Sequence, residues 1–112
     1  WERLTTPKGI VRSTEAQARL DAQTRNLVLY QYRTCPFCMK VRKALARLSL
    51  AVDRRDAQHD AEARRELELQ GGQIKVPCLR ITAADGSRTW LYESDAIIAY
   101  LENLAAATAR PE

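Results

Sequence analysis

The sequence Cys35-Pro36-Phe37-Cys38 constrains the fold more than any other feature of this chain, because it joins two segments of different periodicity. Residues 26–32 before it form an apolar run typical of a buried β-strand, and residues 39–48 after it have the apolar spacing of an amphipathic helix. Pro36 suits the first turn of a helix, where a missing N–H costs nothing. Two cysteines between a strand and a helix N-terminus can form a redox pair, so this dithiol motif predicts thiol–disulfide chemistry.

Length, charge and cysteine count narrow the class of protein. A chain of 112 residues with 46% hydrophobic content suits one compact domain. Its net charge of +4 is spread along the sequence without a dense basic block, so we expect no nucleic-acid partner. Three cysteines are too few for a disulfide-stapled secreted scaffold, and we therefore expect a reducing, cytoplasmic environment.

The N-terminus raises the question of membrane attachment. The sequence contains no run of about eighteen apolar residues, the length that spanning a bilayer requires. The chain begins with Trp1 rather than Met, so we expect that a segment upstream has been removed. If that segment were an anchor, Trp1, Arg3 and Lys8 would suit an interfacial flank and tether the protein to the cytoplasmic face of a membrane.

The pattern of apolar residues divides the chain into three parts. Residues 1–26 are expected to be an N-terminal extension with a short helix that Ser13 or Thr14 could cap, residues 27–105 a single domain, and residues 106–112 a frayed tail. Within the domain we expect strands at 27–32, 50–52, 76–81 and 89–92, and helices at 36–48, 61–70 and 93–104.

This order of elements predicts an α/β fold with a four-stranded mixed sheet flanked by helices. A βαβ crossover makes the first two strands parallel, and a hairpin turn at Asp85-Gly86 makes the last two antiparallel. The dithiol motif then lies at the carboxyl end of a strand, where α/β sheets usually carry their sites.

The two cysteines are expected to have different roles. Cys35 lies just ahead of the helix, where unpaired N–H groups, the helix dipole and the charges of Arg33 and Lys40 would stabilise a thiolate. Cys38, one turn into the helix, is positioned to attack a mixed disulfide on Cys35. We therefore expect Cys35 to be the nucleophile and Cys38 the resolving cysteine.

A zinc site and a third redox thiol are alternative roles for the cysteines. Cys35, Cys38, His59 and Cys78 could in principle form a zinc site, but their spacing is irregular and no second close-spaced pair exists, so no metal is expected. Cys78 itself is expected to be a small interior strand residue. The alternative is a third redox thiol that pairs with Cys35 or forms a mixed disulfide with a small-molecule thiol.

Pro77, which follows Val76, is unusual within a strand because proline has no N–H to donate to a neighbouring strand. It could simply start the strand. We favour a cis Pro77 that faces the dithiol and turns the backbone N–H and C=O of Val76 outward, ready to pair with a peptide-like ligand as an added strand.

Together, the dithiol motif, Val76-Pro77 and the sequence 93–97 (Glu-Ser-Asp-Ala-Ile) resemble the glutaredoxins over residues 27–104. The resemblance implies a thioredoxin fold and a glutathione-dependent thiol–disulfide oxidoreductase that reduces protein disulfides or glutathione mixed disulfides. It further implies glutathione as a cosubstrate. We also expect the protein to be a monomer.

The resemblance also assigns roles to individual residues. Cys35 would become glutathionylated, Val76 would pair with the cysteinyl backbone of glutathione, and Arg64 would meet its glycine carboxylate. Ser94 and Asp95 would bind the γ-glutamyl end. Arg64 could instead be an ordinary surface arginine paired with Glu68. The full set of expected glutathione-binding residues is Tyr32, Arg33, Phe37, Arg64, Val76, Pro77, Ser94 and Asp95.

Several positions depart from the glutaredoxin pattern. Tyr32 stands where a basic residue is usual, Lys75 replaces a threonine, and Leu91-Tyr92 replaces two glycines. Residues 92–97 instead resemble the Glu-Ser element in the thioredoxin-like half of glutathione transferases. Because the chain is too short for their helical second domain, we do not expect transferase activity. The remaining alternatives are a dimeric glutathione-ligated iron–sulfur scaffold and a noncatalytic binding module.

Overall fold

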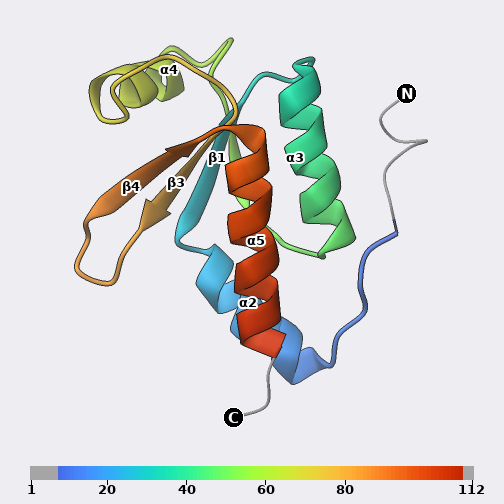
Figure 1. Cartoon of the computed structure of the whole chain (residues 1–112). Coiled ribbons are helices and arrows are strands. Elements are labelled where there is room, and N and C mark those ends of the chain that lie inside the picture. The colour runs from blue at the N-terminus through green and yellow to red at the C-terminus, as the bar shows by residue number, and fades with distance from the viewer. Residues whose placement is uncertain (1–7, 110–112) are drawn as a thin grey trace.

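The computed structural model describes residues 8–109, which contain four strands and the helices that flank them (Figure 1). Trp1 and Arg3 of the expected interfacial flank lie outside the described residues. In chain order the elements are α2 (Thr14–Thr24), β1 (Leu27–Gln31), α3 (Pro36–Arg47), β2 (Asp53–Asp56), α4 (Ala61–Leu69), β3 (Cys78–Thr82), β4 (Arg88–Tyr92) and α5 (Ser94–Ala109).

The sheet has the predicted mixed topology. Its strand order is β2-β1-β3-β4, with β1 parallel to β2 and antiparallel to β3, and with β3 antiparallel to β4. The turn between β3 and β4 closes through hydrogen bonds of Ala83 with Ser87 and Gly86, and Gly86 has a φ of 88°, which a glycine adopts without strain. The expected α/β fold and hairpin are therefore confirmed.

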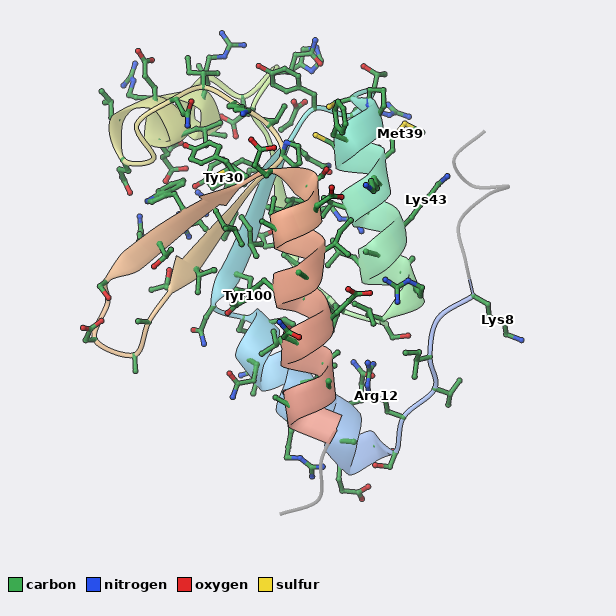
Figure 2. All side chains as sticks on the ribbon, viewed as in Figure 1. Lys8, Arg12, Tyr30, Met39, Lys43 and Tyr100 are labelled. Carbon is green, nitrogen blue, oxygen red and sulfur yellow. The ribbon has the colours of Figure 1, made fainter. Side chains whose placement is uncertain are left out.

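Helices cover both faces of the sheet. Alternate side chains of β1 point to opposite faces, so this strand contributes to the packing on each side. Leu27 and Leu29 pack with α2, α3 and α5 in the main core, where α3 and α5 lie side by side (Figure 1). Val28 and Tyr30 face the other way and pack under α4 in a second cluster, in which Tyr30 is fully buried (Figure 2). Burial on both faces explains why β1 is continuously apolar in sequence.

The N-terminal helix α2 belongs to the main core rather than standing apart from it. Ser13 is its N-cap and accepts a hydrogen bond from the Ala16 N–H at 3.1 Å, as predicted. Leu20 and Thr24 are buried, and the helix packs against α5. Residues assigned to an extension therefore complete the hydrophobic core of the sheet.

A polar network lies inside the second cluster, beneath α4. The Glu66 carboxylate accepts hydrogen bonds from the Tyr30 hydroxyl at 3.2 Å and from Arg55 at 2.6 Å. Arg80, which is only 8% exposed, donates to the Tyr30 hydroxyl at 3.0 Å and lies 3.9 Å from Glu66. Because a buried guanidinium needs a counter-charge, Glu66 neutralises Arg80 at the centre of the network.

The second strand was predicted at residues 50–52, and this prediction was wrong. The strand is β2, Asp53–Asp56, which pairs with β1 from Val28↔Asp53 onward. Leu50 and Val52 pack on the main core from the segment that leads into it. An edge strand is held by backbone pairing while its side chains face water, so the apolar pattern marked the connection instead of the strand.

Other element ends differ from the prediction. β1 ends at Gln31 instead of Tyr32, and β3 spans Cys78–Thr82 instead of residues 76–81. The frayed tail expected from residue 106 is helical through Ala109, because α5 continues against α2, Ala105 is buried, and alanine has the highest helix propensity. Within residues 8–109 no helix is both long and apolar enough to cross a membrane.

Candidate functional site

The first cysteine of the dithiol motif lies at the N-terminus of α3. Because α3 begins at Pro36, Cys35 is its N-cap, and the Cys35 carbonyl accepts the first helical hydrogen bond, from Met39, at 2.9 Å. The thiol of Cys35 is free and half-buried, and it makes no capping hydrogen bond. The first turn of α3 contains no acidic residue. The Cys35 sulfur is therefore accessible at the positive end of the helix dipole.

The second cysteine is in a different environment. Cys38 is fully buried. Burial and, to a smaller extent, a hydrogen bond with Cys35 raise the pKa of the Cys38 thiol to about 11, against the opposing effects of the Tyr32 backbone and Arg42. Cys38 therefore keeps its proton at neutral pH, and its S–H can donate to the Cys35 sulfur.

Arg42 holds the loop that carries the dithiol motif. Arg42 is only 6% exposed, and its guanidinium donates hydrogen bonds to the Gln31 side chain at 2.9 Å and to the Arg33 carbonyl at 2.7 Å. It also lies 3.5 Å from the Tyr32 carbonyl. These bonds tie α3 to the end of β1, so Arg42 fixes the backbone that leads into Cys35.

A cavity of about 220 Å³ lies against the first turn of α3. One wall is Val76-Pro77, whose peptide bond is cis, as predicted. Another wall is formed by the start of α5, where Ser94 is buried. The Glu93 carbonyl accepts a hydrogen bond from the Ile97 N–H at 3.1 Å, so Glu93 is the N-cap of α5 and Ser94 is its first residue. The lining residues are Phe37, Lys40, Lys75, Val76, Pro77, Glu93, Ser94 and Asp95.

Two ion pairs border this cavity. Lys40 of α3 contacts Asp95 at 2.6 Å, and Lys75 contacts Glu93 at 2.9 Å. All four side chains are at least half exposed, so each pair contributes little to stability. Long exposed side chains can exchange partners, and the cavity therefore offers both signs of charge to a ligand with ammonium and carboxylate groups.

The structure brings together five of the eight expected glutathione-binding residues: Phe37, Val76, Pro77, Ser94 and Asp95. Tyr32, Arg33 and Arg64 do not line the cavity. Tyr32 packs against the second cluster, and Arg33 is exposed. Arg64 donates to the backbone carbonyls of Ala57 and Gln58, so it braces the turn before α4 instead of pairing with Glu68.

Three of the lining residues, Lys40, Lys75 and Glu93, were not among the expected ligand contacts. Lys40 follows Phe37 by three residues, so the two lie on one face of α3. Lys75 and Glu93 each directly precede an expected contact. Arg42 was also missed, although it lies four residues after Cys38 and therefore on the buried face of α3, where a charge is unusual.

The structure gives no geometric support for a zinc site. His59 is exposed, and its ring Nδ1 lies 2.8 Å from the Asp56 carboxylate. Across the described part of the chain, no group of three or more His, Cys, Asp or Glu side chains is arranged to hold a metal ion.

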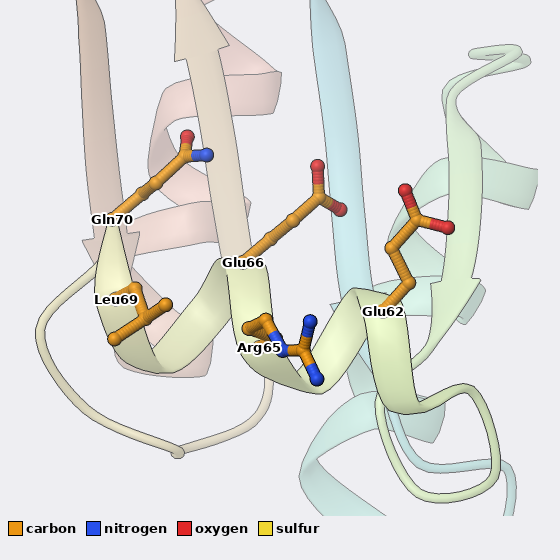
Figure 3. A pocket seen from close by; sticks show the side chains of 5 residues that line it. All are labelled: Glu62, Arg65, Glu66, Leu69 and Gln70. Carbon is orange, nitrogen blue, oxygen red and sulfur yellow. The ribbon is translucent and has the colours of Figure 1, made fainter.

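A larger hollow, of about 560 Å³, lies elsewhere on the surface (Figure 3). Its lining side chains come from α4 and from the C-cap residue that follows it: Glu62, Arg65, Glu66, Leu69 and Gln70. A single helix face without a cysteine, a strand end or convergent elements offers no redox chemistry, so the smaller cavity beside the dithiol is the candidate site.

Comparison with known proteins identifies related chains. A family model described as "Glutathione S-transferase, N-terminal domain" matches residues 29–109. A maleylacetoacetate isomerase from Anaeromyxobacter dehalogenans 2CP-1, solved with bound dicarboxyethyl glutathione and citrate in the active site, is 29% identical with a TM-score of 0.55. In that alignment 78% of this chain covers 41% of the isomerase. The same isomerase solved with bound GSH gives 28% identity, a TM-score of 0.55, and coverages of 78% and 42%.

Wheat glutaredoxin has the same fold over nearly its whole length. It is 20% identical with a TM-score of 0.55, and 88% of this chain covers 96% of it. No curated protein sequence gives a match. The described residues thus have the thioredoxin fold that the glutaredoxin resemblance implied. Since the family model covers most of the sequence, the chain belongs to the glutathione S-transferase N-terminal domain family.

Proposed function

We propose that this protein is a glutathione-dependent thiol–disulfide oxidoreductase that reduces protein disulfides or glutathione mixed disulfides. The observation that carries this proposal is the unequal dithiol beside a cavity for a peptide-like ligand. Cys35 is accessible at the N-terminus of α3, whereas Cys38 is buried and protonated behind it. A conjugating enzyme needs no second thiol, but a disulfide reductase can use one.

The reaction consists of two thiol–disulfide exchanges. The Cys35 thiolate attacks the glutathione sulfur of a mixed disulfide, forms a Cys35–glutathione disulfide and releases the protein thiolate, which takes a proton from solvent. The thiolate of a second glutathione then attacks this disulfide, and oxidised glutathione leaves as Cys35 regains its thiolate. In all, one glutathione thiol is oxidised, the mixed disulfide is reduced to a protein thiol, and oxidised glutathione is formed.

Cys38 supplies an alternative second step. Its sulfur can lose a proton and attack the Cys35 sulfur of the mixed disulfide, which breaks the bond to the substrate, releases the substrate sulfur as a thiolate and forms a Cys35–Cys38 disulfide. Two glutathione molecules later reduce this disulfide and leave as oxidised glutathione. This route serves protein disulfides, where the first attack links Cys35 to the substrate protein. Its cost is deprotonation of a buried thiol with a pKa of about 11.

Several features support glutathione as the cosubstrate. Among the described residues, no turn or loop hydrogen bond involves the Val76 backbone, so its N–H and C=O suit pairing with an extended tripeptide. Lys40 and Lys75 match the carboxylates of glutathione, and Glu93 and Asp95 match its ammonium group. The related isomerase was solved with bound GSH. All three cysteines are free thiols, which suits a protein of a reducing compartment such as the cytoplasm.

The decisive experiment is a glutathione mixed-disulfide reduction assay on the wild type, Cys35→Ser and the matched variant Cys38→Ser. Loss of turnover in Cys35→Ser alone indicates a monothiol cycle, and loss in both variants indicates a dithiol cycle. A wild type without turnover would refute the proposal. The same preparation tested for glutathione conjugation and maleylacetoacetate isomerisation distinguishes an oxidoreductase from a transferase-like or isomerase-like enzyme, and visible absorbance reveals an iron–sulfur cluster.

A further inference from the structure

Cys78 and Tyr92 connect the two walls of the cavity. They are direct partners in the register between β3 and β4. Cys78 directly follows Pro77 in one wall, and Tyr92 directly precedes Glu93 in the other. A contact between these two side chains therefore acts on both walls at once.

The Tyr92 hydroxyl has two hydrogen-bond partners. It donates to the carbonyl of Gln73 at 3.0 Å, in the loop that leads to Val76. It is also hydrogen-bonded to the Cys78 thiol. The result is a relay from Cys78 through Tyr92 to the backbone of Gln73.

Both members of the relay keep their protons at neutral pH. Cys78 is fully buried, and burial raises the pKa of its thiol to about 12 against the lowering effect of the Tyr92 hydrogen bond. Burial, followed by the neighbouring Cys78, also raises the pKa of Tyr92 to about 12. The thiolate is the reactive form of a cysteine, so Cys78 is unsuited to act as a third nucleophile.

The loop after α4 packs directly on this relay. A Cβ atom at Gly71 would lie 2.5 Å from the Tyr92 hydroxyl and 3.0 Å from the Trp90 ring. Only glycine allows the backbone to approach the two rings so closely. The hydroxyl of Tyr92 is therefore held by packing as well as by its hydrogen bonds.

We propose that Cys78 and Tyr92 are positioning residues that fix the Val76-Pro77 wall relative to the Glu93-Ser94 wall and thereby set the affinity for glutathione. In this role Cys78 is a hydrogen-bond partner of Tyr92 and takes no part in electron transfer. The inference rests on the proposed function, because it assumes that glutathione binds between these walls.

Kinetics separate this role from a redox role and from simple core packing. We expect Cys78→Ala and Tyr92→Phe to raise the KM for glutathione by about three- to tenfold, the equivalent of one hydrogen bond, with kcat changed by less than about twofold. Cys78→Ser should recover most of the affinity, because its hydroxyl can form the same hydrogen bond with Tyr92. The control is Val28→Ala, which truncates a buried residue of the same cluster on β1 and should leave the KM unchanged.

Two kinetic outcomes would overturn the inference. One is a Cys78→Ser variant as impaired as Cys78→Ala, which would indicate a role for the thiol itself. The other is a Val28→Ala variant with the same rise in KM, which would indicate general packing.

A measurement without glutathione distinguishes failure of this inference from failure of the proposed function. If the relay holds the loop, backbone ¹⁵N order parameters of residues 73–76 should fall from about 0.85 toward about 0.6 in Cys78→Ala and Tyr92→Phe, and should return in Cys78→Ser. Equal order parameters in all variants would overturn the relay. If the wild type neither binds nor turns over glutathione, the proposed function fails, and the order parameters alone decide whether the relay positions the two walls.

Discussion

Buried Cys38 should resist alkylation in the native protein while half-buried Cys35 reacts. With a pKa of about 11, the Cys38 thiol is a thiolate in about one molecule in 10,000 at pH 7. An unfolded cysteine, with a pKa of about 8.5, is about 3% thiolate at the same pH. The native protein thus has about 300-fold less Cys38 thiolate than the unfolded chain.

The higher basicity of the Cys38 thiolate offsets part of this deficit. Nucleophilicity rises with pKa by a Brønsted coefficient of about 0.4–0.5, which recovers about tenfold over this interval. Native Cys38 should therefore react with iodoacetamide about 30-fold more slowly than the same residue in urea-unfolded protein at pH 7, before any further loss from its burial. Because the pKa is raised, the rate should increase about tenfold per pH unit and level off only near pH 11.

The assay is pulse alkylation followed by mass spectrometry of each cysteine peptide, with the urea-unfolded protein as the reference. Cys35 should be modified first and Cys38 much later. Native Cys38 that reacts within about threefold of its unfolded rate at pH 7 would refute the argument that burial holds it protonated.

Three further substitutions test the parts of the structure that support the site, each by urea unfolding. Glu66→Gln should lower the free energy of unfolding by about 2 kcal/mol, because it leaves Arg80 without its counter-charge. This loss is below the usual cost of leaving a buried charge unpaired, since Glu66 is partly exposed. A change below about 0.5 kcal/mol would show that Arg80 needs no partner. Arg42→Met should cost about 2–3 kcal/mol, since it removes the donors to the loop before the dithiol, and an unchanged midpoint would contradict this bracing role. Gly71→Ala should cost about 1–3 kcal/mol by overpacking against Tyr92 and should also raise the KM for glutathione; a variant with wild-type stability would show that the loop moves away without cost.

Periodicity and turn chemistry predicted most of the fold correctly. The buried strand before Cys35, the helix after it and the Asp85-Gly86 hairpin all follow from local signals that agree with the tertiary structure. Periodicity failed at β2, because an edge strand needs no apolar side chains. It also stopped α5 too early, because the packing of α5 against α2 is a contact between distant parts of the chain.

The candidate site could be predicted where a sequence motif fixes the backbone, and could not be predicted where a long side chain can reach several hydrogen-bond partners. The dithiol at the start of α3, the cis Pro77 and Ser94 at the start of α5 all depend on local chain geometry and lie where expected. Arg64 has a long side chain that could reach several acceptors, and it binds nearby carbonyls of its own turn. The roles of Arg42 and Tyr92 depend on loop carbonyls, which no sequence pattern reveals.

Trapping the covalent intermediate tests the central claim most directly. Cys38→Ser protein is incubated with oxidised glutathione, and the site of modification is mapped by mass spectrometry. The account predicts one glutathione per chain, attached to Cys35, and its release by added reduced glutathione. Absence of the adduct, or attachment to Cys78 with Cys35 unmodified, would contradict the claim that Cys35 is the nucleophile of a glutathione-dependent thiol–disulfide exchange.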